Sequence, residues 1–367
     1  MKKIDLFHFG SAGMYDKLNP FYIYDKEYAS EVLFLIASNN PFTLDNVYIS
    51  DKLKSNIGYI NDLLSSMVEI QMIREDHGKY CINFPIFLEK DIEILSEFAK
   101  KTAKKIADIL IDHKSNIIKM LPKMDFSNER LMYHIIGDYI LDGTSLKYFS
   151  DKKVFKISKQ QIGNRDYLLI GFENSDLMNS FSNNILCSKN NYVVDNIKFN
   201  SFGDGNGERH DVYRLIRNKV CTRDYVDCSV DFINRIIKQE TYLEDLTPIE
   251  KDYYKFFEKL GYLHNSNSKI YIKVPIFTKE HKKTLTKISN YILDLIELDV
   301  ISSFKDIKQK SKTLSALKHD VCLEEIANEL WHQLFGGINE HLVKEGFFAK
   351  PKHILNQGRY FQSLYIS

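Results

Sequence analysis

The chain has 367 residues, of which 44% are hydrophobic and 27% charged, a composition typical of a folded protein with more than one domain. Its 50 lysines and arginines balance 49 aspartates and glutamates, so a global basic field is excluded and any contact with DNA must come from a local patch. The sequence lacks a signal-peptide pattern and any run of about 18 apolar residues, and its five cysteines are dispersed. We therefore expect a cytoplasmic protein without a membrane-spanning helix.

The strongest signal in the sequence is an internal repeat. Residues 73–87 align without gaps on 263–277, and five residues recur: Lys79, Ile82, Pro85, Ile86 and Phe87 return as Lys269, Ile272, Pro275, Ile276 and Phe277. Three further blocks match in the same order: 4–10 with 197–203, 30–36 with 210–216, and Gly137 with Tyr148–Phe149 against Gly336 with Phe347–Phe348. We predict a tandem duplication with units at 1–175 and 190–367.

Helix and turn signals follow one another closely within the first unit. The predicted elements are a helix opening at 25–28 and stopping at 39–41, a short helix capped at 43–46, a third helix starting at Ser50 or Ser55, a polar turn at 75–78 and a strand at 79–84. This order of three helices and a hairpin predicts a winged helix at about 25–88. The repeat then predicts a second one at about 208–278.

Each winged helix is followed by further predicted elements. A long helix with an apolar stripe begins near Ile92 and has its counterpart near Leu285. Each unit then has a helix and a hairpin: Leu131–Leu141 with Val154–Phe172, and Ile326–Val343 with Ile354–Ile366. The predicted fold class is mainly α with small β-hairpins (α+β), as a duplicated winged-helix unit with an added helix and hairpin.

Three stretches of the first unit, 41–44, 50–64 and 70–73, resemble the ArsR- and MarR-like winged-helix regulators of bacteria. The resemblance covers only about 60 residues of each copy. It implies binding to double-stranded DNA, with the third helix in the major groove, because that groove admits a helix and displays the informative base edges.

The DNA-contact candidates follow from this docking. In the first copy they lie before and along the third helix and in the wing, which is the hairpin segment 74–79. They are Lys52, Lys54, Ser55, Asn56, Tyr59, Asn61, Arg74, His77 and Lys79. In the second copy they are Lys251, Lys255 and Lys269, but Glu250 and Asp252 lie in the same helix and would repel phosphate. We therefore expect the first copy to specify DNA: alanine at Asn56 and Tyr59 should abolish binding, and alanine at Lys251 and Lys255 should do much less.

Other chemistry is not indicated. The glycine-rich segment 203–208 lacks the ending of a P-loop and the spacing of an EF-hand, and Cys221, Cys228 and His210 lack zinc-ligand spacing. No nucleophile elbow, HExxH, Walker or Rossmann pattern occurs. We expect no enzyme, no cofactor and no metal site.

The predicted function is a sequence-specific transcription regulator that acts as an intramolecular pseudo-dimer of winged helices. Two alternatives remain open: a protein-interaction module that binds a transcription component, and a plasmid or phage replication initiator. A positive face along 52–64 and 74–79 would favour nucleic acid, and a negative or mixed face would favour a protein partner. Aromatic residues gather in the C-terminal part of each unit, where a small-molecule, peptide or protein effector could bind; a homodimer is also compatible with the sequence.

Overall fold

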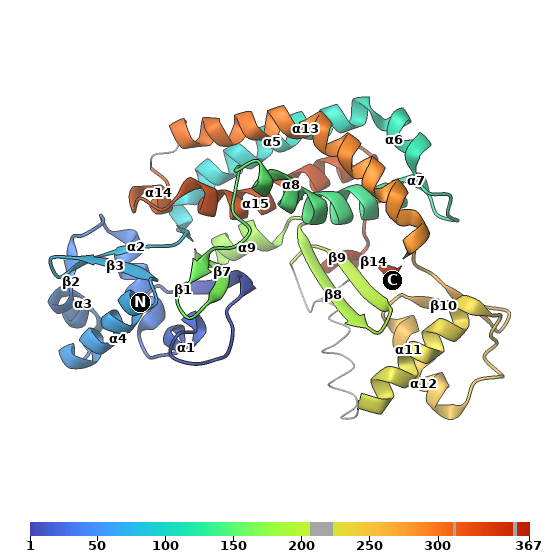
Figure 1. Cartoon of the computed structure of the whole chain (residues 1–367), viewed down its shortest axis with the longest axis horizontal. Helices are drawn as coiled ribbons and strands as arrows, with labels where there is room; N and C mark the ends of the chain where they lie inside the picture. Colours follow the sequence, from blue (N-terminus) through green and yellow to red (C-terminus); the bar gives the residue numbers. More distant parts are fainter. Residues whose placement is uncertain (206–222, 311–312, 355–357) are drawn as a thin grey trace. The chain divides into compact units, whose positions relative to one another are not determined.

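The computed structural model describes residues 1–205, 223–310, 313–354 and 358–367 (Figure 1). It is 52% helical and 20% strand, so the fold is mixed α/β and compatible with the predicted α+β class. Its main sheets have four and five strands and are larger than the small hairpins that the sequence predicted. Among the described residues, none of the helices is both long and apolar enough to cross a membrane.

The chain divides into two compact units, each assembled from three stretches of sequence. Unit 1 comprises Met1–Ile106, Thr144–Asn183 and Ile296–Gly337; unit 2 comprises Ala107–Gly143, Asn184–Leu295 and Ile338–Ser367. The repeat boundaries predicted above, 1–175 and 190–367, describe similarity of sequence. The compact units follow packing instead. Three helices, α5 (Ile92–Asp112), α13 (Lys282–Lys310) and α15 (Leu323–Lys344), therefore contribute residues to both units.

Unit 1 begins with a small helical body that we call the first head, residues 29–82. Its elements are α2 (Ala29–Ser38), β2 (Leu44–Asp45), α3 (Asn46–Leu53), α4 (Ile57–Glu69), β3 (Ile73–Asp76) and β4 (Lys79–Ile82). The Asp45 carboxylate accepts a hydrogen bond from the Tyr48 amide at 2.8 Å and so caps α3. His77 and Gly78 both have positive φ angles, which closes the β3–β4 hairpin in a tight turn.

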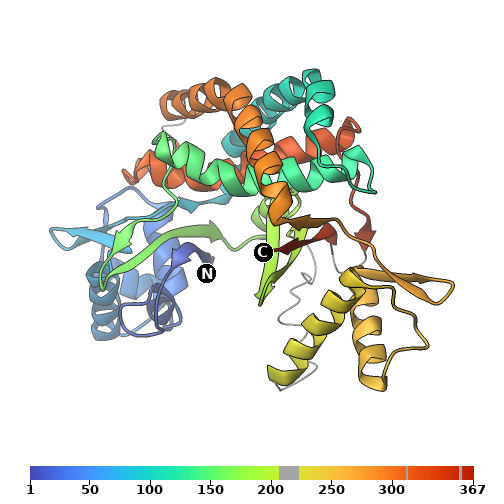
Figure 2. The same cartoon turned by 45° about the vertical axis from the view of Figure 1, so that its right-hand side comes forward.

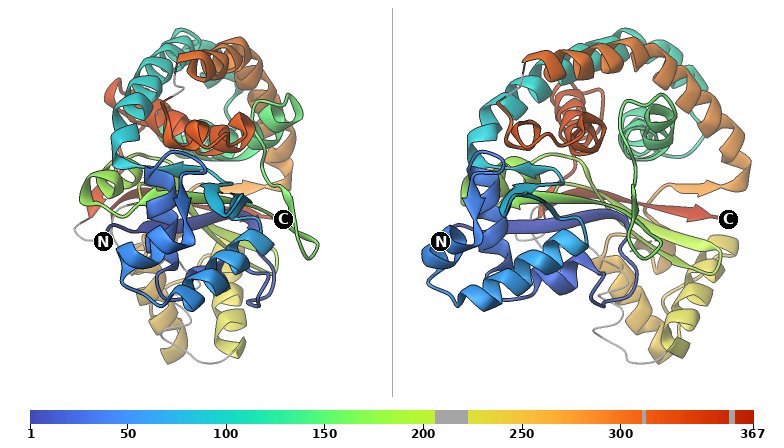
Figure 3. Two further views of the ribbon diagram at one scale, coloured as in Figure 1. Left: turned by 90° about the vertical axis from the view of Figure 1, so that its left-hand side faces the viewer. Right: turned by 60° about the vertical axis from the view of Figure 1, so that its left-hand side comes forward.

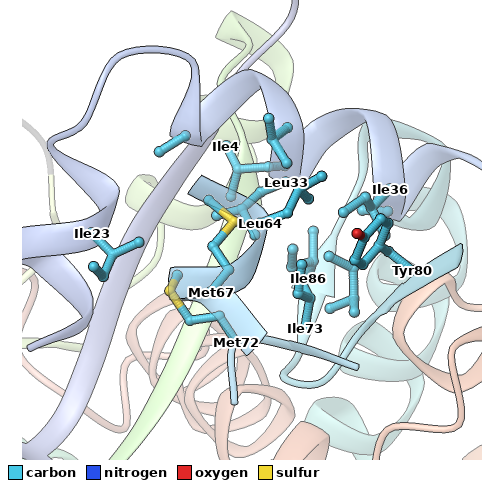
Figure 4. Close-up of a cluster of buried hydrophobic side chains, with 14 of the residues drawn as sticks. Ile4, Ile23, Leu33, Ile36, Leu64, Met67, Met72, Ile73, Tyr80 and Ile86 are labelled. Atoms are coloured by element: carbon cyan, nitrogen blue, oxygen red, sulfur yellow. The ribbon is translucent and has the colours of Figure 1, made fainter. Parts of the chain in front are cut away.

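The first head packs on a four-stranded sheet. In this sheet β7 (Arg165–Glu173) lies between β1 (Ile4–Ser11), which is antiparallel to it, and β5 (Ile86–Phe87), which is parallel; β6 (Gln160–Gln161) also pairs with β7. Ile4 from β1 meets Leu33, Leu64 and Met67 from the head in one buried cluster (Figure 4). Burial of this apolar area is the main force holding the head to the sheet.

The remaining elements of unit 1 are mostly helical. They are α1 (Pro20–Tyr24), η1 (Glu89–Asp91), α8 (Ser145–Asp151), α9 (Asp176–Asn183), α14 (Ser315–Lys318), and the unit 1 parts of α5 (Ile92–Asp112), α13 (Lys282–Lys310) and α15 (Leu323–Lys344). Trp331 of α15 is fully buried against Phe149 and Phe155. Asp91 joins two of these segments, because its carboxylate accepts from the Ser315 amide at 3.0 Å.

Unit 2 has a sheet of the same kind and a second head, residues 223–272. The head has α11 (Arg223–Lys238), α12 (Pro248–Lys259), β10 (Leu263–Ser266) and β11 (Lys269–Ile272). The sheet has the order β12 (Ile276–Thr278), β14 (Gly358–Ile366), β9 (Ile197–Gly203), β8 (Ser188–Val194), with β13 (His353–Ile354) also paired to β14. Figure 2 shows the dark-red β14 beside the light-green β9.

The helical part of unit 2 includes an unusual element. Its pieces are α6 (Lys114–Met120), α7 (Asn128–Met132), a π-helix η2 (Tyr133–Thr144), η3 (Lys279–His281) and the unit 2 parts of α5, α13 and α15. The sequence predicted an ordinary helix over Leu131–Leu141. π-Helical segments are rare and often accompany functional sites, so the side chains of η2 are candidates for such a site.

The two units share a strand arrangement and a spacing. In unit 1, β1 is antiparallel and β5 parallel to β7; in unit 2, β9 is antiparallel and β12 parallel to β14. The elements β5, η1 and α5 begin at Ile86, Glu89 and Ile92. The elements β12, η3 and α13 begin at Ile276, Lys279 and Lys282, each 190 residues later.

Candidate functional site

Most of the predicted contact residues of the first head lie around the start of α4 (blue in Figure 3). Lys54 ends α3 in a left-handed conformation, with φ of 52°. Asn56 is the cap of α4, and its side-chain oxygen accepts from the amides of Gly58 and Tyr59 at 2.8 and 3.3 Å. Lys52, Lys54 and Asn56 are exposed, and no carboxylate occurs from residue 52 to 61.

Two predicted contact residues also have structural tasks that the sequence did not reveal. The Tyr59 hydroxyl donates to the Glu27 carbonyl at 3.1 Å, and its ring meets that of Tyr28 edge-on. Asn61 accepts a hydrogen bond from the Asn46 amide group at 2.7 Å, which ties α4 to α3. The Tyr59 ring is still 36% exposed, so it remains available to a ligand.

Exposed apolar side chains flank the same helix start. Val47 and Tyr48 on α3 are 52% and 42% exposed, and Ile57 at the start of α4 is 43% exposed. We call these three residues the apolar patch. The Lys52 ammonium lies 5.4 Å from the centre of the Tyr48 ring, in cation–π range. Apolar groups at such a surface suit either a protein partner or the methyl groups of thymine.

The wing is less suited to phosphate than the sequence suggested. The Arg74 guanidinium already has partners within unit 1: it donates to the His319 carbonyl at 2.5 Å and lies over the Phe42 ring. His77 and Lys79 are exposed, with Glu75 and Asp76 beside them. From residue 45 to 79 the chain has four lysines and arginines against six aspartates and glutamates. The face is therefore positive at the start of α4 and mixed at the wing.

The second head exposes two lysines from which the sequence analysis expected only a small contribution to DNA binding. Lys251 and Lys255 are exposed on α12. Burial disfavours the charge of Glu250, but hydrogen bonds from Thr247 and the nearby Arg235 hold the pKa of its carboxyl below the usual value. This carboxylate is thus occupied by the cap and by Arg235, 2.8 Å away. Lys269 is not free, since it forms an ion pair with Glu240.

A buried polar cluster in unit 2 was missed by sequence reasoning. Lys189 on β8 lies 2.7 Å from the Asp138 carboxylate and 3.3 Å from that of Asp142, both on the π-helix. The Asn200 amide donates to Asp138 at 2.6 Å and to the Ser363 hydroxyl at 3.2 Å. Burial, aided by the negative charge of Asp138, raises the pKa of Asp142 to about 7 against the opposing charge of Lys189. We call these five residues the polar cluster.

Two histidines of unit 2 lie in contrasting surroundings. His134 is fully buried, neither of its ring nitrogens has a hydrogen-bond partner, and burial lowers its pKa to about 3. His113 is hydrogen-bonded to the Tyr291 hydroxyl at 2.7 Å. No group of three or more histidine, cysteine, aspartate or glutamate side chains with metal-site geometry occurs among the described residues.

Some sequence predictions lie outside the described residues. They are the repeat block 210–216, residues 206–208 of the glycine-rich segment, His210, Cys221 and the side chain of Cys228. Comparison of the chain with protein-family models, with curated proteins and with solved structures gives no match.

Proposed function

We propose that the chain is a DNA-binding transcription regulator built from two copies of one winged-helix unit. The shared spacing of 190 residues and the shared strand arrangement support the duplication. Two glycines at matching places support it as well. A β-carbon at Gly10 would collide with the main chain of Asp166, and one at Gly203 would collide with the main chain of Arg359.

The start of α4 carries the proposal that the first head binds DNA. It combines two exposed lysines, the positive end of a helix dipole and polar side chains, with no carboxylate from residue 52 to 61. In this class of docking, the first residues of the recognition helix contact the base edges. Lys52 and Lys54 would bind phosphate, and Ser55, Asn56 and Tyr59 would reach phosphates or bases.

Fluorescence anisotropy with genomic DNA fragments over a salt series tests this function. We expect the double variant Lys52→Ala and Lys54→Ala to bind at least about tenfold more weakly, with a salt slope smaller by about two, because two phosphate contacts are lost. The pair Lys251→Ala and Lys255→Ala should have a smaller effect.

Asn56 needs a variant that keeps the cap of α4. Asn56→Ser retains a capping side chain and should weaken binding without loss of stability, whereas Asn56→Ala also costs about 1 kcal/mol of stability. Wild-type protein that binds no fragment, or binds with no salt dependence, would contradict the proposal. Bound fragments from an origin, in place of promoters, would indicate a replication initiator.

A protein partner is the second candidate function, because the apolar patch is exposed and the wing has mixed charge. A photo-crosslinking amino acid at Ile57 should then yield one discrete protein adduct in cells, which charged substitutions at Val47 and Tyr48 remove. The same probe at Leu298, which is 79% exposed on α13, serves as the control. If the probes at Ile57 and at Leu298 gave the same set of protein adducts, a specific partner at the apolar patch would be excluded.

A further inference from the structure

Unit 1 contains a cavity of about 470 Å³ between its parts of α5 and α13. Figures 1 and 3 show the two helices, cyan and orange, running side by side. The side chains that line the cavity lie on one face of each helix, with one residue beyond: Ile94, Glu97, Phe98, Lys101, Thr102, Lys105, Ser302, Ser303, Asp306, Ile307 and Thr313. Its size falls in the range of pockets for small molecules, about 300–1,000 Å³.

Unit 2 has a tyrosine at the corresponding place. The spacing of 190 residues pairs Lys101 with Tyr291, Ser303 with His113, and Asp306 with Asn116. In unit 2 the Tyr291 hydroxyl is hydrogen-bonded to the His113 ring nitrogen Nδ1 at 2.7 Å and accepts from the Asn116 amide at 3.4 Å. The imidazole meets the tyrosine ring edge-on, with centroids 5.9 Å apart. A phenol side chain thus bridges α13 to His113, which follows α5, and to Asn116 in α6.

The residues of unit 1 are smaller or more flexible at these positions. Serine replaces histidine at 303, and the same spacing pairs Thr102 with the buried Ile292. Lys101 occupies the position that corresponds to Tyr291 of unit 2, and it has no ion-pair partner among the described residues. Lys105 is paired with Asp299 at the edge of the cavity. The space in unit 1 therefore lies where unit 2 has the aromatic side chains of Tyr291 and His113.

We propose that the cavity of unit 1 binds a small molecule with a phenol ring, which occupies the place that the Tyr291 side chain takes in unit 2. The inference uses the spacing of the proposed duplication and is independent of DNA binding. The ring would pack on Phe98 and Ile307, which line the cavity. The hydroxyl would face Ser303 and Asp306, the counterparts of the two residues that bind the Tyr291 hydroxyl. The Lys101 ammonium would stabilise the phenolic oxygen.

The probe for this site is p-cresol, which is the side chain of tyrosine itself. We expect saturable binding to the full chain by ligand-observed NMR and a rise in Tm of about 2–4 °C near saturation. Toluene, which has the same ring without the hydroxyl, should bind clearly more weakly. Lys101→Tyr should restore the bridging group of unit 2, raise Tm without ligand and abolish the binding of p-cresol.

A second variant keeps the test independent of how Lys101→Tyr folds. Ser303→Trp fills the same cavity from α13 and should also abolish binding, whereas Lys123→Tyr, at an exposed site outside the cavity, should leave it unchanged. Absence of saturable binding to the wild type, or binding unaffected by both cavity variants, overturns the proposal. Because no DNA is present, neither result depends on whether the first head binds DNA.

Discussion

Replacement of Trp331 by alanine is expected to lower the free energy of unfolding by about 3–5 kcal/mol. Trp331 is 0% exposed, and its ring lies 5.0 Å from that of Phe149, 6.1 Å from Phe155 and 6.0 Å from Phe335. These rings join α15 to α8 and to the segment before β6 within unit 1. Removal of the indole loses its burial and leaves a cavity that three rigid rings can fill only in part.

The measurement is urea unfolding followed by far-UV circular dichroism. Trp331 is the only tryptophan in the chain, so the variant has no indole fluorescence to follow. Leu298→Ala is the matched control, because Leu298 is 79% exposed and its truncation should change stability by less than about 0.5 kcal/mol. A loss below about 1 kcal/mol for Trp331→Ala would mean that this aromatic cluster does not hold unit 1 together.

The elements of the first head were predicted well because their signals are local. The predicted helix stop at 39–41 follows α2, which ends at Ser38, and the predicted turn at 75–78 contains the turn of the β3–β4 hairpin. Boundaries were less accurate where the backbone takes an unexpected conformation. The first helix begins at Ala29, after Tyr28 with φ of 65°, and α4 is capped by Asn56 in place of Ser50 or Ser55.

Pairings between distant residues could not be predicted. The hairpin predicted over Val154–Phe172 contains the short β6–β7 pair, but β7 also pairs along almost its whole length with β1, where Ile4 faces Glu173. A period of two indicates a strand and which face is buried, and it does not identify the neighbouring strand. The four strands of this sheet come from three separate stretches of sequence, so the sheet is larger than the small hairpins that were predicted.

The candidate site was predicted in part for the same reason. Local pattern placed Lys52, Lys54 and Asn56 correctly around one helix start. It could not reveal that Arg74 binds the His319 carbonyl, or that Glu250 is held by Arg235. The polar cluster had no signal at all, since its members come from the π-helix, β8, β9 and β14.

The polar cluster is expected to contribute strongly to stability. Lys189→Met should lower the free energy of unfolding by about 3–5 kcal/mol near pH 8 and by much less near pH 5. Lys189 is the cation that forms ion pairs with Asp138 and Asp142, and its loss leaves these buried carboxylates without an ion-pair partner, with only the weaker effect of Lys198 nearby. Burial by itself opposes the charge of Lys189, but the two carboxylates raise its pKa, so it is protonated across this whole pH range.

The pH dependence has a definite sign. The pKa of Asp142 is about 7 in the folded protein and near 3.8 in the unfolded chain, so the folded state binds more protons between these values. Stability contributed by this carboxyl is therefore fully present below about pH 4 and is lost as the pH rises towards 7. Without Lys189 the pKa of Asp142 should rise further. The free energy of unfolding of Lys189→Met should therefore fall more steeply above neutrality and remain closer to the wild-type value in acid.

Urea unfolding at a series of pH values measures both effects. Asp142→Asn in the native background should flatten the pH dependence between about pH 4 and 7, because the titrating carboxyl is gone. The double variant Lys189→Met with Asp142→Asn should recover part of the stability lost near pH 8. Lys123→Met, which removes an exposed lysine, should have little effect at any pH. An equal loss for Lys189→Met near pH 5 and pH 8 would show that Lys189 acts by packing, and not by balancing the carboxylates of the π-helix.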